Sequence, residues 1–114
     1  MKSIFIFEDE ESKKELFRCA LNSSINLFCD SVPDTLIYLD QEVYDIIFLD
    51  GHVPTGSGIE VAKHIQKSIN KDTRVIIHSS DPVIAEEMKK IVGDKAEIRE
   101  FGSSGWIEFL KEAK

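Results

Sequence analysis

The chain has 114 residues, of which 42% are hydrophobic and 31% are charged. This is the composition of one globular domain over residues 1–114, so intrinsic disorder, a low-complexity polymer and a disulfide-rich scaffold are excluded. Lys and Arg number 14 against 21 Asp and Glu, and the resulting net charge of −7 argues against a groove that binds DNA or RNA.

Short apolar segments alternate along the chain with segments of helical periodicity. The apolar segments predict strands, in chain order, at Ile4–Phe7, Ile25–Cys29, Ile46–Leu49, Val75–Ile77 and Ala96–Ile98. The periodic segments predict helices over Glu11–Leu21, from Pro33, over Gly58–Ile69, from Pro82 behind an Asp81 N-cap, and around Trp106 to Leu110. In the third helix, one apolar stripe is expected to face the core through Ile59, Ala62, Ile65 and Ile69.

This alternation predicts an α/β fold with a parallel sheet covered by helices on both faces. Ile4–Phe7, Ile46–Leu49 and Val75–Ile77 are uninterrupted apolar runs, as in central strands that are buried on both faces. The other two strands alternate with polar residues, as edge strands do. The pattern predicts a doubly wound (βα)5 flavodoxin-like fold with strand order 2-1-3-4-5, whose ligand site lies beyond the carboxyl ends of the first and third strands.

The sequence gives no sign of a membrane or an export signal. The N-terminus MKSIFIFEDE has one positive charge and a short apolar run, unlike a signal peptide. The longest apolar runs are far too short to cross a membrane. We therefore expect a cytoplasmic domain without membrane contact, in which Cys19 and Cys29 are small buried side chains.

Acidic residues gather where the predicted site lies. Glu8 and Asp9 follow the first strand, and Asp50 ends the third. Carboxylates that converge raise one another's pKa, and a hard divalent cation relieves the repulsion, so these residues predict a Mg²⁺ site. The alternative is that acidic residues simply favour solvated strand ends and helix N-termini, which accounts better for Glu10 and Glu11 than for Asp50.

The stretch Asp50-Gly-His-Val-Pro-Thr-Gly-Ser-Gly58 resembles the CheY-like receiver domains of two-component response regulators. In that family a Pro and then a Gly follow the phosphoacceptor Asp at these spacings. The Glu8-Asp9 pair matches the family's acidic pair, and Ser79 stands where receivers carry a hydroxyl that contacts the phosphoryl group. The resemblance implies that Asp50 is the phosphoacceptor, that Asp9 and Asp50 bind Mg²⁺ directly, and that Glu8 does so through water.

The chain departs from receivers at the end of the fifth strand, where the family has a Lys-Pro pair. Arg99-Glu100-Phe101 stands there instead, so Arg99 is the candidate for the positive charge. A guanidinium is larger than an ammonium and prefers bidentate geometry, so this exchange is not neutral. The resemblance implies a stand-alone receiver in phosphorelay signalling, with a sensor kinase or small phosphodonor, a downstream protein partner and no DNA binding by this domain.

Two histidines support an alternative function. The run Ile77-His-Ser-Ser-Asp-Pro82, with Met88 and Phe101-Gly102 after it, is similar to receiver-like domains proposed to process cyclic phosphates. In that hypothesis His52 and His78 flank a cyclic phosphate end of RNA or a nucleotide, and one acts as general base and the other as general acid. A solvated loop position for His52 and a core position for His78 are the simpler interpretations. A non-catalytic, receiver-shaped adaptor is the third possibility.

Overall fold

The computed structural model describes residues 2–53 and 56–99, without the side chains of His52 and Val53. The elements in these ranges are β1 (Ser3–Phe7), α1 (Glu11–Ala20), β2 (Ile25–Cys29), α2 (Val32–Gln41), β3 (Ile46–Leu49), β4 (His52–Val53), β5 (Gly56–Ser57), α3 (Gly58–Ile65), β6 (Arg74–Ile77), α4 (Pro82–Val92) and β7 (Ala96–Ile98). The predicted helix around Trp106 lies outside the described residues.

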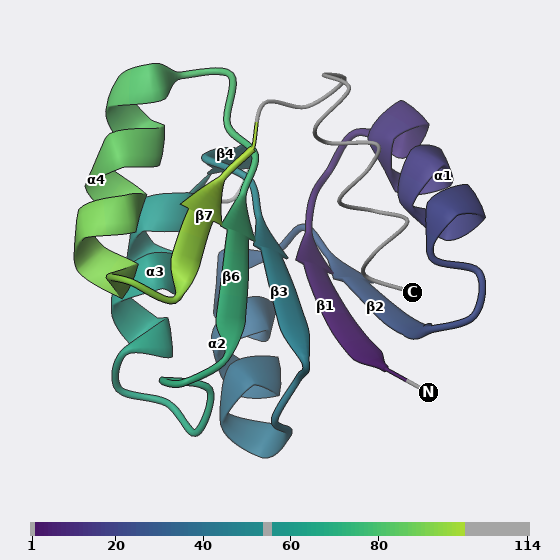
Figure 1. The fold of residues 1–114 in the computed structure, drawn as a ribbon, viewed down its shortest axis with the longest axis horizontal. Helices are drawn as coiled ribbons and strands as arrows, with labels where there is room; N and C mark the ends of the chain where they lie inside the picture. The colour runs from purple at the N-terminus through teal and green to yellow at the C-terminus, as the bar shows by residue number, and fades with distance from the viewer. Residues whose placement is uncertain (1, 54–55, 100–114) are drawn as a thin grey trace.

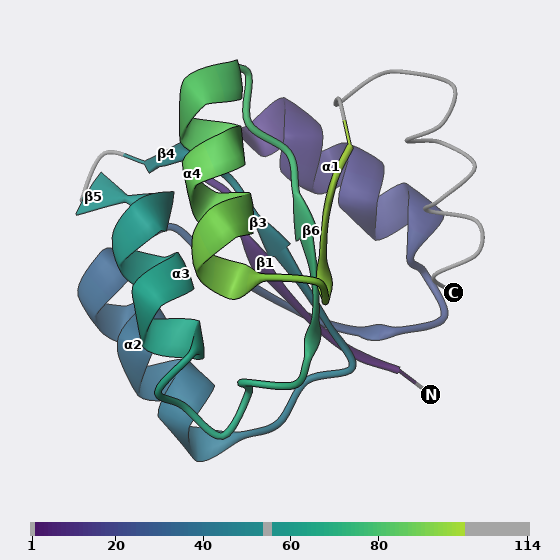
Figure 2. The ribbon, with the colours of Figure 1, turned by 60° about the vertical axis from the view of Figure 1, so that its left-hand side comes forward.

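The central feature is a parallel five-stranded sheet in the order β2-β1-β3-β6-β7. This confirms the predicted order, with β2 and β7 at the edges. Helix α1 covers one face, and α2, α3 and α4 lie along the other (Figures 1 and 2). The short antiparallel hairpin of β4 and β5 between β3 and α3 was not predicted.

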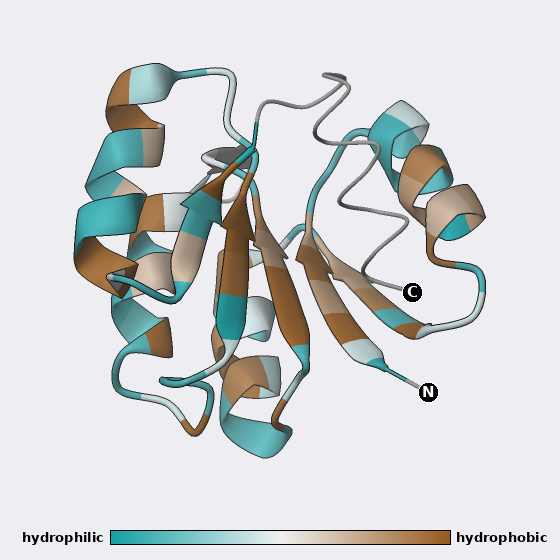
Figure 3. Cartoon of the chain, viewed as in Figure 1, coloured by the Kyte–Doolittle hydropathy of each residue, from teal (hydrophilic) through white to brown (hydrophobic). Residues whose placement is uncertain are grey.

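Each central strand contributes to two apolar cores, because successive side chains point to opposite faces of a sheet. Phe5 and Phe7 pack with the residues of α2, α3 and α4. Ile4 and Ile6 pack on the other face, against Phe17 of α1. Both sets are fully buried, which explains why β1, β3 and β6 are almost uninterrupted hydrophobic ribbons in Figure 3.

The N-cap of α4 holds the chain where it turns after β6. Asp81 accepts hydrogen bonds from the backbone N–H groups of Val83 (2.9 Å) and Ile84 (3.3 Å), with Pro82 at the first helical position. The predicted start of α4 is therefore confirmed. Among the described residues, no helix is long and apolar enough to cross a membrane.

Two expectations from the sequence are wrong. Helix α3 ends at Ile65, and Ile69 is 53% exposed rather than part of the buried stripe. The Ile65 carbonyl accepts from the backbone N–H (3.2 Å) and hydroxyl (2.9 Å) of Ser68, which closes the last turn before Ile69 can continue the helix. Cys19 lies exposed on α1 instead of buried, whereas Cys29 is half-buried and packs against the edge of the core.

A polar clamp holds the end of the sheet where β3 and β6 begin. The fully buried Asn70 donates from its side-chain amide to the carbonyls of Leu39 and Glu42, both at 2.8 Å. Its side-chain oxygen accepts from the Tyr44 backbone N–H (2.9 Å) and the Thr73 hydroxyl (3.0 Å). One side chain thus joins the end of α2 to the segments that lead into β3 and β6.

Candidate functional site

The candidate site lies at the opposite end, where β1, β3 and β6 finish side by side. Phe7, Leu49 and Ile77 are neighbours in the sheet. The residues that follow continue this alignment, because the Asp50 N–H donates to the Phe7 carbonyl (3.2 Å) and the His78 N–H to the Leu49 carbonyl (3.1 Å). The order of the strands, rather than their spacing in sequence, therefore brings residues after β1 and β3 together.

Three carboxylates meet at this end. One oxygen each of Glu8, Asp9 and Asp50 lies within 4.8 Å of the others. Glu8 is completely buried and Asp50 is 9% exposed, while Asp9 is half-buried. The Glu8 Oε2 atom accepts from the backbone N–H groups of Asp9 (3.0 Å) and Glu10 (3.2 Å), which fixes the carboxylate at the start of α1.

Ionisation of Glu8 is unfavourable in this cluster. Burial, and next the neighbouring charge of Asp50, raise the pKa of Glu8 to about 8. The Glu10 backbone hydrogen bond and the Lys13 ammonium lower that pKa without offsetting the rise. Such a group favours either a proton or a cation beside it. Three closely spaced carboxylate oxygens suit a hard divalent cation such as Mg²⁺, so the donor set fits the predicted metal.

His78 lies next to Glu8, in the apolar layer between the sheet and α1. Its side chain is fully buried, and its ring centroid lies 5.6 Å from that of Phe17 and 6.4 Å from that of Phe48. Its Nδ1 atom is 3.6 Å from Glu8 Oε1. Burial, helped by the Lys13 charge, lowers the pKa of His78 to about 3, so the ring is neutral near pH 7. This location agrees with the simpler, core interpretation of His78.

The other predicted histidine gives less information. The His52 backbone pairs with Ser57 in the hairpin that follows Asp50. Its side chain lies outside the part of the chain that the structure describes. A shared site for His52 and His78 on a cyclic phosphate therefore stays a prediction.

Ser79 is half-buried one residue beyond His78 and faces the segment after Asp50. Its Oγ atom accepts from the Asp81 N–H at 3.2 Å. A Cβ atom built on Gly51 would collide with this oxygen. Only glycine therefore lets the Ser79 hydroxyl approach the chain beside Asp50, a contact that the sequence analysis missed although the Asp-Gly pair marks the place.

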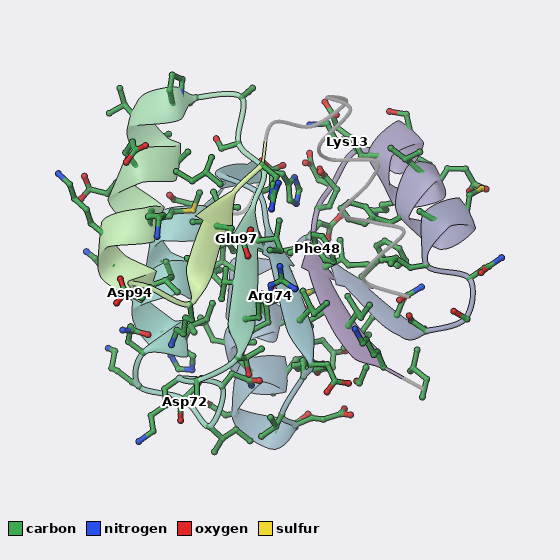
Figure 4. All side chains as sticks on the ribbon, viewed as in Figure 1. Lys13, Phe48, Asp72, Arg74, Asp94 and Glu97 are labelled. Carbon is green, nitrogen blue, oxygen red and sulfur yellow. The ribbon has the colours of Figure 1, made fainter. Side chains whose placement is uncertain are left out.

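Arg99 lies in a row of ion pairs. Its Nη2 atom donates to Glu97 Oε2 at 2.7 Å, and Arg74 Nη2 donates to Glu97 Oε1 at 2.8 Å. Hydrogen bonds from Arg74 and then Arg99 lower the pKa of Glu97. Figure 4 shows Arg74 and Glu97 together over the face of β6 and β7, away from Lys13. The part of Arg99 in phosphoryl chemistry stays a prediction.

Gly58, the first residue of α3, holds the Asp50 backbone by close approach. A Cβ atom there would overlap the Asp50 carbonyl oxygen and come within 2.8 Å of Met88 Sδ. We expect Gly58→Ala to destabilise the chain by about 1–3 kcal/mol, because backbone and a packed core side chain must both shift. Urea unfolding measures the change in the free energy of unfolding. Gly93→Ala is unsuitable as a control, because Gly93 has a φ of 91° and an alanine there would strain the backbone.

Lys63→Ala, on the exposed face of the same helix, is the matched control and should stay within about 0.5 kcal/mol of the native chain. A Gly58→Ala chain as stable as the native one would show that α3 can move away from Asp50 at no cost.

Comparison with known proteins gives structural matches only. No protein-family model matches the chain, and neither does any curated protein sequence. A receiver domain of a sensor histidine kinase from Pseudomonas aeruginosa, with a magnesium ion coordinated in its active-site cleft, superposes with a TM-score of 0.80 at 14% identity. The alignment covers 97% of this chain and 95% of that domain.

Two response regulators extend the similarity. A phosphorylated cyanobacterial phytochrome response regulator matches with a TM-score of 0.80 at 21% identity, over 98% of this chain and 90% of that one. A response regulator from Thermotoga maritima, in complex with Mg²⁺ and BeF, matches with a TM-score of 0.77 at 24% identity over 100% of both chains. The chain therefore has the receiver fold of response regulators, with an acidic cluster at the carboxyl end of its sheet.

Proposed function

We propose that this protein is a receiver domain that accepts a phosphoryl group on Asp50 in a Mg²⁺-dependent reaction. The observation that carries the proposal is the carboxylate cluster of Glu8, Asp9 and Asp50, whose oxygens lie within 4.8 Å of one another beyond β1 and β3. In an open α/β sheet, ligands bind at this position. The similar structures include one with magnesium and one that is phosphorylated, which supports the same chemistry here.

In the proposed reaction, an Asp50 carboxylate oxygen attacks the phosphorus of the donor. A new O–P bond forms, the bond between phosphorus and the donor's leaving group breaks, and the electron pair leaves with that group. The three carboxylates would hold Mg²⁺, which supplies positive charge to the phosphoryl oxygens when it is bound. Ser79 donates its hydroxyl to the transferred group, and Arg99 supplies positive charge from the end of β7.

A histidine kinase, or a small phosphorylated molecule, is the proposed donor, and a protein partner receives the signal. The cyclic-phosphate alternative gains no support from the described residues, because it needs His78 to reach a substrate. The His78 side chain has no solvent-exposed surface, and burial lowers its pKa to about 3. A buried base of that kind is unsuited to proton transfer near pH 7.

The test is intact-mass spectrometry after incubation with acetyl phosphate and Mg²⁺. We expect a mass increase of one phosphoryl group, and none when the metal is chelated. The control is calorimetric titration with Mg²⁺ on the same sample. A chain that binds Mg²⁺ but takes up no phosphoryl group would overturn the proposal and favour an adaptor without chemistry.

A further inference from the structure

One cation, Lys13, approaches the acidic cluster from the first turn of α1. Lys13 is the third residue of α1, and its Nζ atom lies 3.3 Å from Glu10 Oε2. The Glu10 N–H in turn donates to Glu8 Oε2 at 3.2 Å. The Lys13 side chain is only 23% exposed, so its stem is packed and its ammonium is held at the edge of the cluster. Figure 4 shows it at the carboxyl end of the sheet, beside the start of α1.

This position is unfavourable for the helix itself. The N-terminal turn of a helix carries partial positive charge and favours acidic residues over lysines. Burial of the stem adds a further cost, since it is the largest influence on the Lys13 pKa and lowers it. The charge of Glu8, the hydrogen bond to Glu10 and the charge of Asp50 together outweigh burial, and the pKa is raised. The acidic cluster, and not the helix, therefore favours a cation here.

The influence also runs in the other direction. The Lys13 charge lowers the pKa of Glu8 in the carboxylate cluster and the pKa of the buried His78 beside it. The neighbouring lysine has no such position, because Lys14 Nζ lies 3.9 Å from Glu11 Oε2, a carboxylate on the outer surface. Arg99, the other candidate cation, donates to Glu97. Lys13 is thus a lysine whose charge interacts with that of Asp50.

We propose that Lys13 binds the phosphoryl group on Asp50, with its ammonium donating to a phosphoryl oxygen. The inference rests on the proposed function. The phosphoryl dianion on Asp50, together with the carboxyl groups of Glu8 and Asp9 beside it, carries negative charge beyond what one divalent cation neutralises. The stem of Lys13 stays packed, and rotation about the terminal bonds of the side chain turns the ammonium from Glu10 to a nearby oxyanion. The ligand class is a phosphoryl oxyanion, whichever donor delivers it.

The test compares Lys13→Met, which keeps the packed stem and removes the charge, with Lys13→Arg and the matched control Lys14→Met. The rate of phosphoryl uptake from acetyl phosphate is followed by intact mass, and the Kd for Mg²⁺ by calorimetry. We expect Lys13→Met to slow uptake at least about tenfold, since removal of one charged donor to a transferring group costs this much or more. Lys13→Arg should recover part of the rate, and Lys14→Met should react as the native chain does.

The Kd for Mg²⁺ separates a binding role from a structural one. Loss of a cation beside three carboxylates should leave Mg²⁺ binding unchanged or make it tighter. Slower uptake with intact or tighter Mg²⁺ binding supports the proposal. Phosphoryl uptake at the native rate in Lys13→Met overturns the inference and leaves the proposed function standing. Slower uptake together with weaker Mg²⁺ binding also overturns the inference, because it indicates a distorted site. A native chain without uptake overturns the proposed function and this inference with it.

Discussion

The Asp50→Asn chain is expected to take up no phosphoryl group from acetyl phosphate. A neutral amide lacks the carboxylate oxygen that attacks phosphorus, so no acyl phosphate forms. We also expect weaker Mg²⁺ binding, because one of three clustered carboxylates is lost. The charge of Asp50 helps to raise the pKa of Glu8, so that pKa should fall toward its ordinary value in the variant. Intact mass measures the uptake, and calorimetry measures the metal affinity.

Asp72→Asn is the matched control, since Asp72 is exposed in the segment between α3 and β6, away from the site (Figure 4). It should react at the native rate and bind Mg²⁺ with the native Kd. Uptake by Asp50→Asn at the native level would place the acceptor on another residue, and fragmentation of the modified chain would then identify it.

The metal-free chain is expected to lose stability as the pH rises from neutral to about 8, and Glu8→Gln is expected to remove this loss. The pKa of Glu8 is raised from 4.5 to about 8 by folding. The stabilisation linked to its proton is therefore complete below about pH 4.5 and is lost as the pH rises through about 8. A shift of this size corresponds to a change on the order of several kcal/mol in the free energy of unfolding. Urea unfolding between pH 4 and about 9 measures it.

His78 acts in the opposite direction and at lower pH. Folding lowers its pKa from 6.5 to about 3, so its contribution is complete above about pH 6.5 and is lost as the pH falls through about 3. The two groups oppose each other between about pH 4.5 and 6.5, and stability should vary least there. Mg²⁺ should restore stability at about pH 8, because it binds the charged carboxylates of the folded chain. The same slope above neutral pH in Glu8→Gln as in the native chain would assign the titration to another group.

The sequence predicted the strands better than the helices. Ile25–Cys29, Ile46–Leu49 and Ala96–Ile98 have the expected bounds, because an apolar run between polar residues can be placed without tertiary information. Helix α3 is shorter than its periodicity suggests, since hydrogen bonds from Ser68 close it after Ile65. The hairpin of β4 and β5 has two residues in each strand, too few for any periodic signal.

The carboxylates of the site could be predicted because topology alone brings strand ends together. Glu8, Asp9 and Asp50 needed only the order of β1 and β3 to be placed side by side. The burial of His78 and the closeness of the Lys13 ammonium to the carboxylates depend on the orientation of each side chain. Short sequence motifs do not encode this orientation. A lysine in the first turn of α1, where helices favour acids, was the available signal for Lys13.

The Asn70 clamp has a consequence for how the molecule opens. Its side chain hydrogen-bonds to three chain segments, so local unfolding of any one segment leaves buried amide and carbonyl groups without partners. Small, local fluctuations are therefore suppressed at the end of the sheet away from Asp50. The Tyr44 amide proton should exchange with deuterium only when the whole domain unfolds, which makes it a reporter of global stability rather than of fraying.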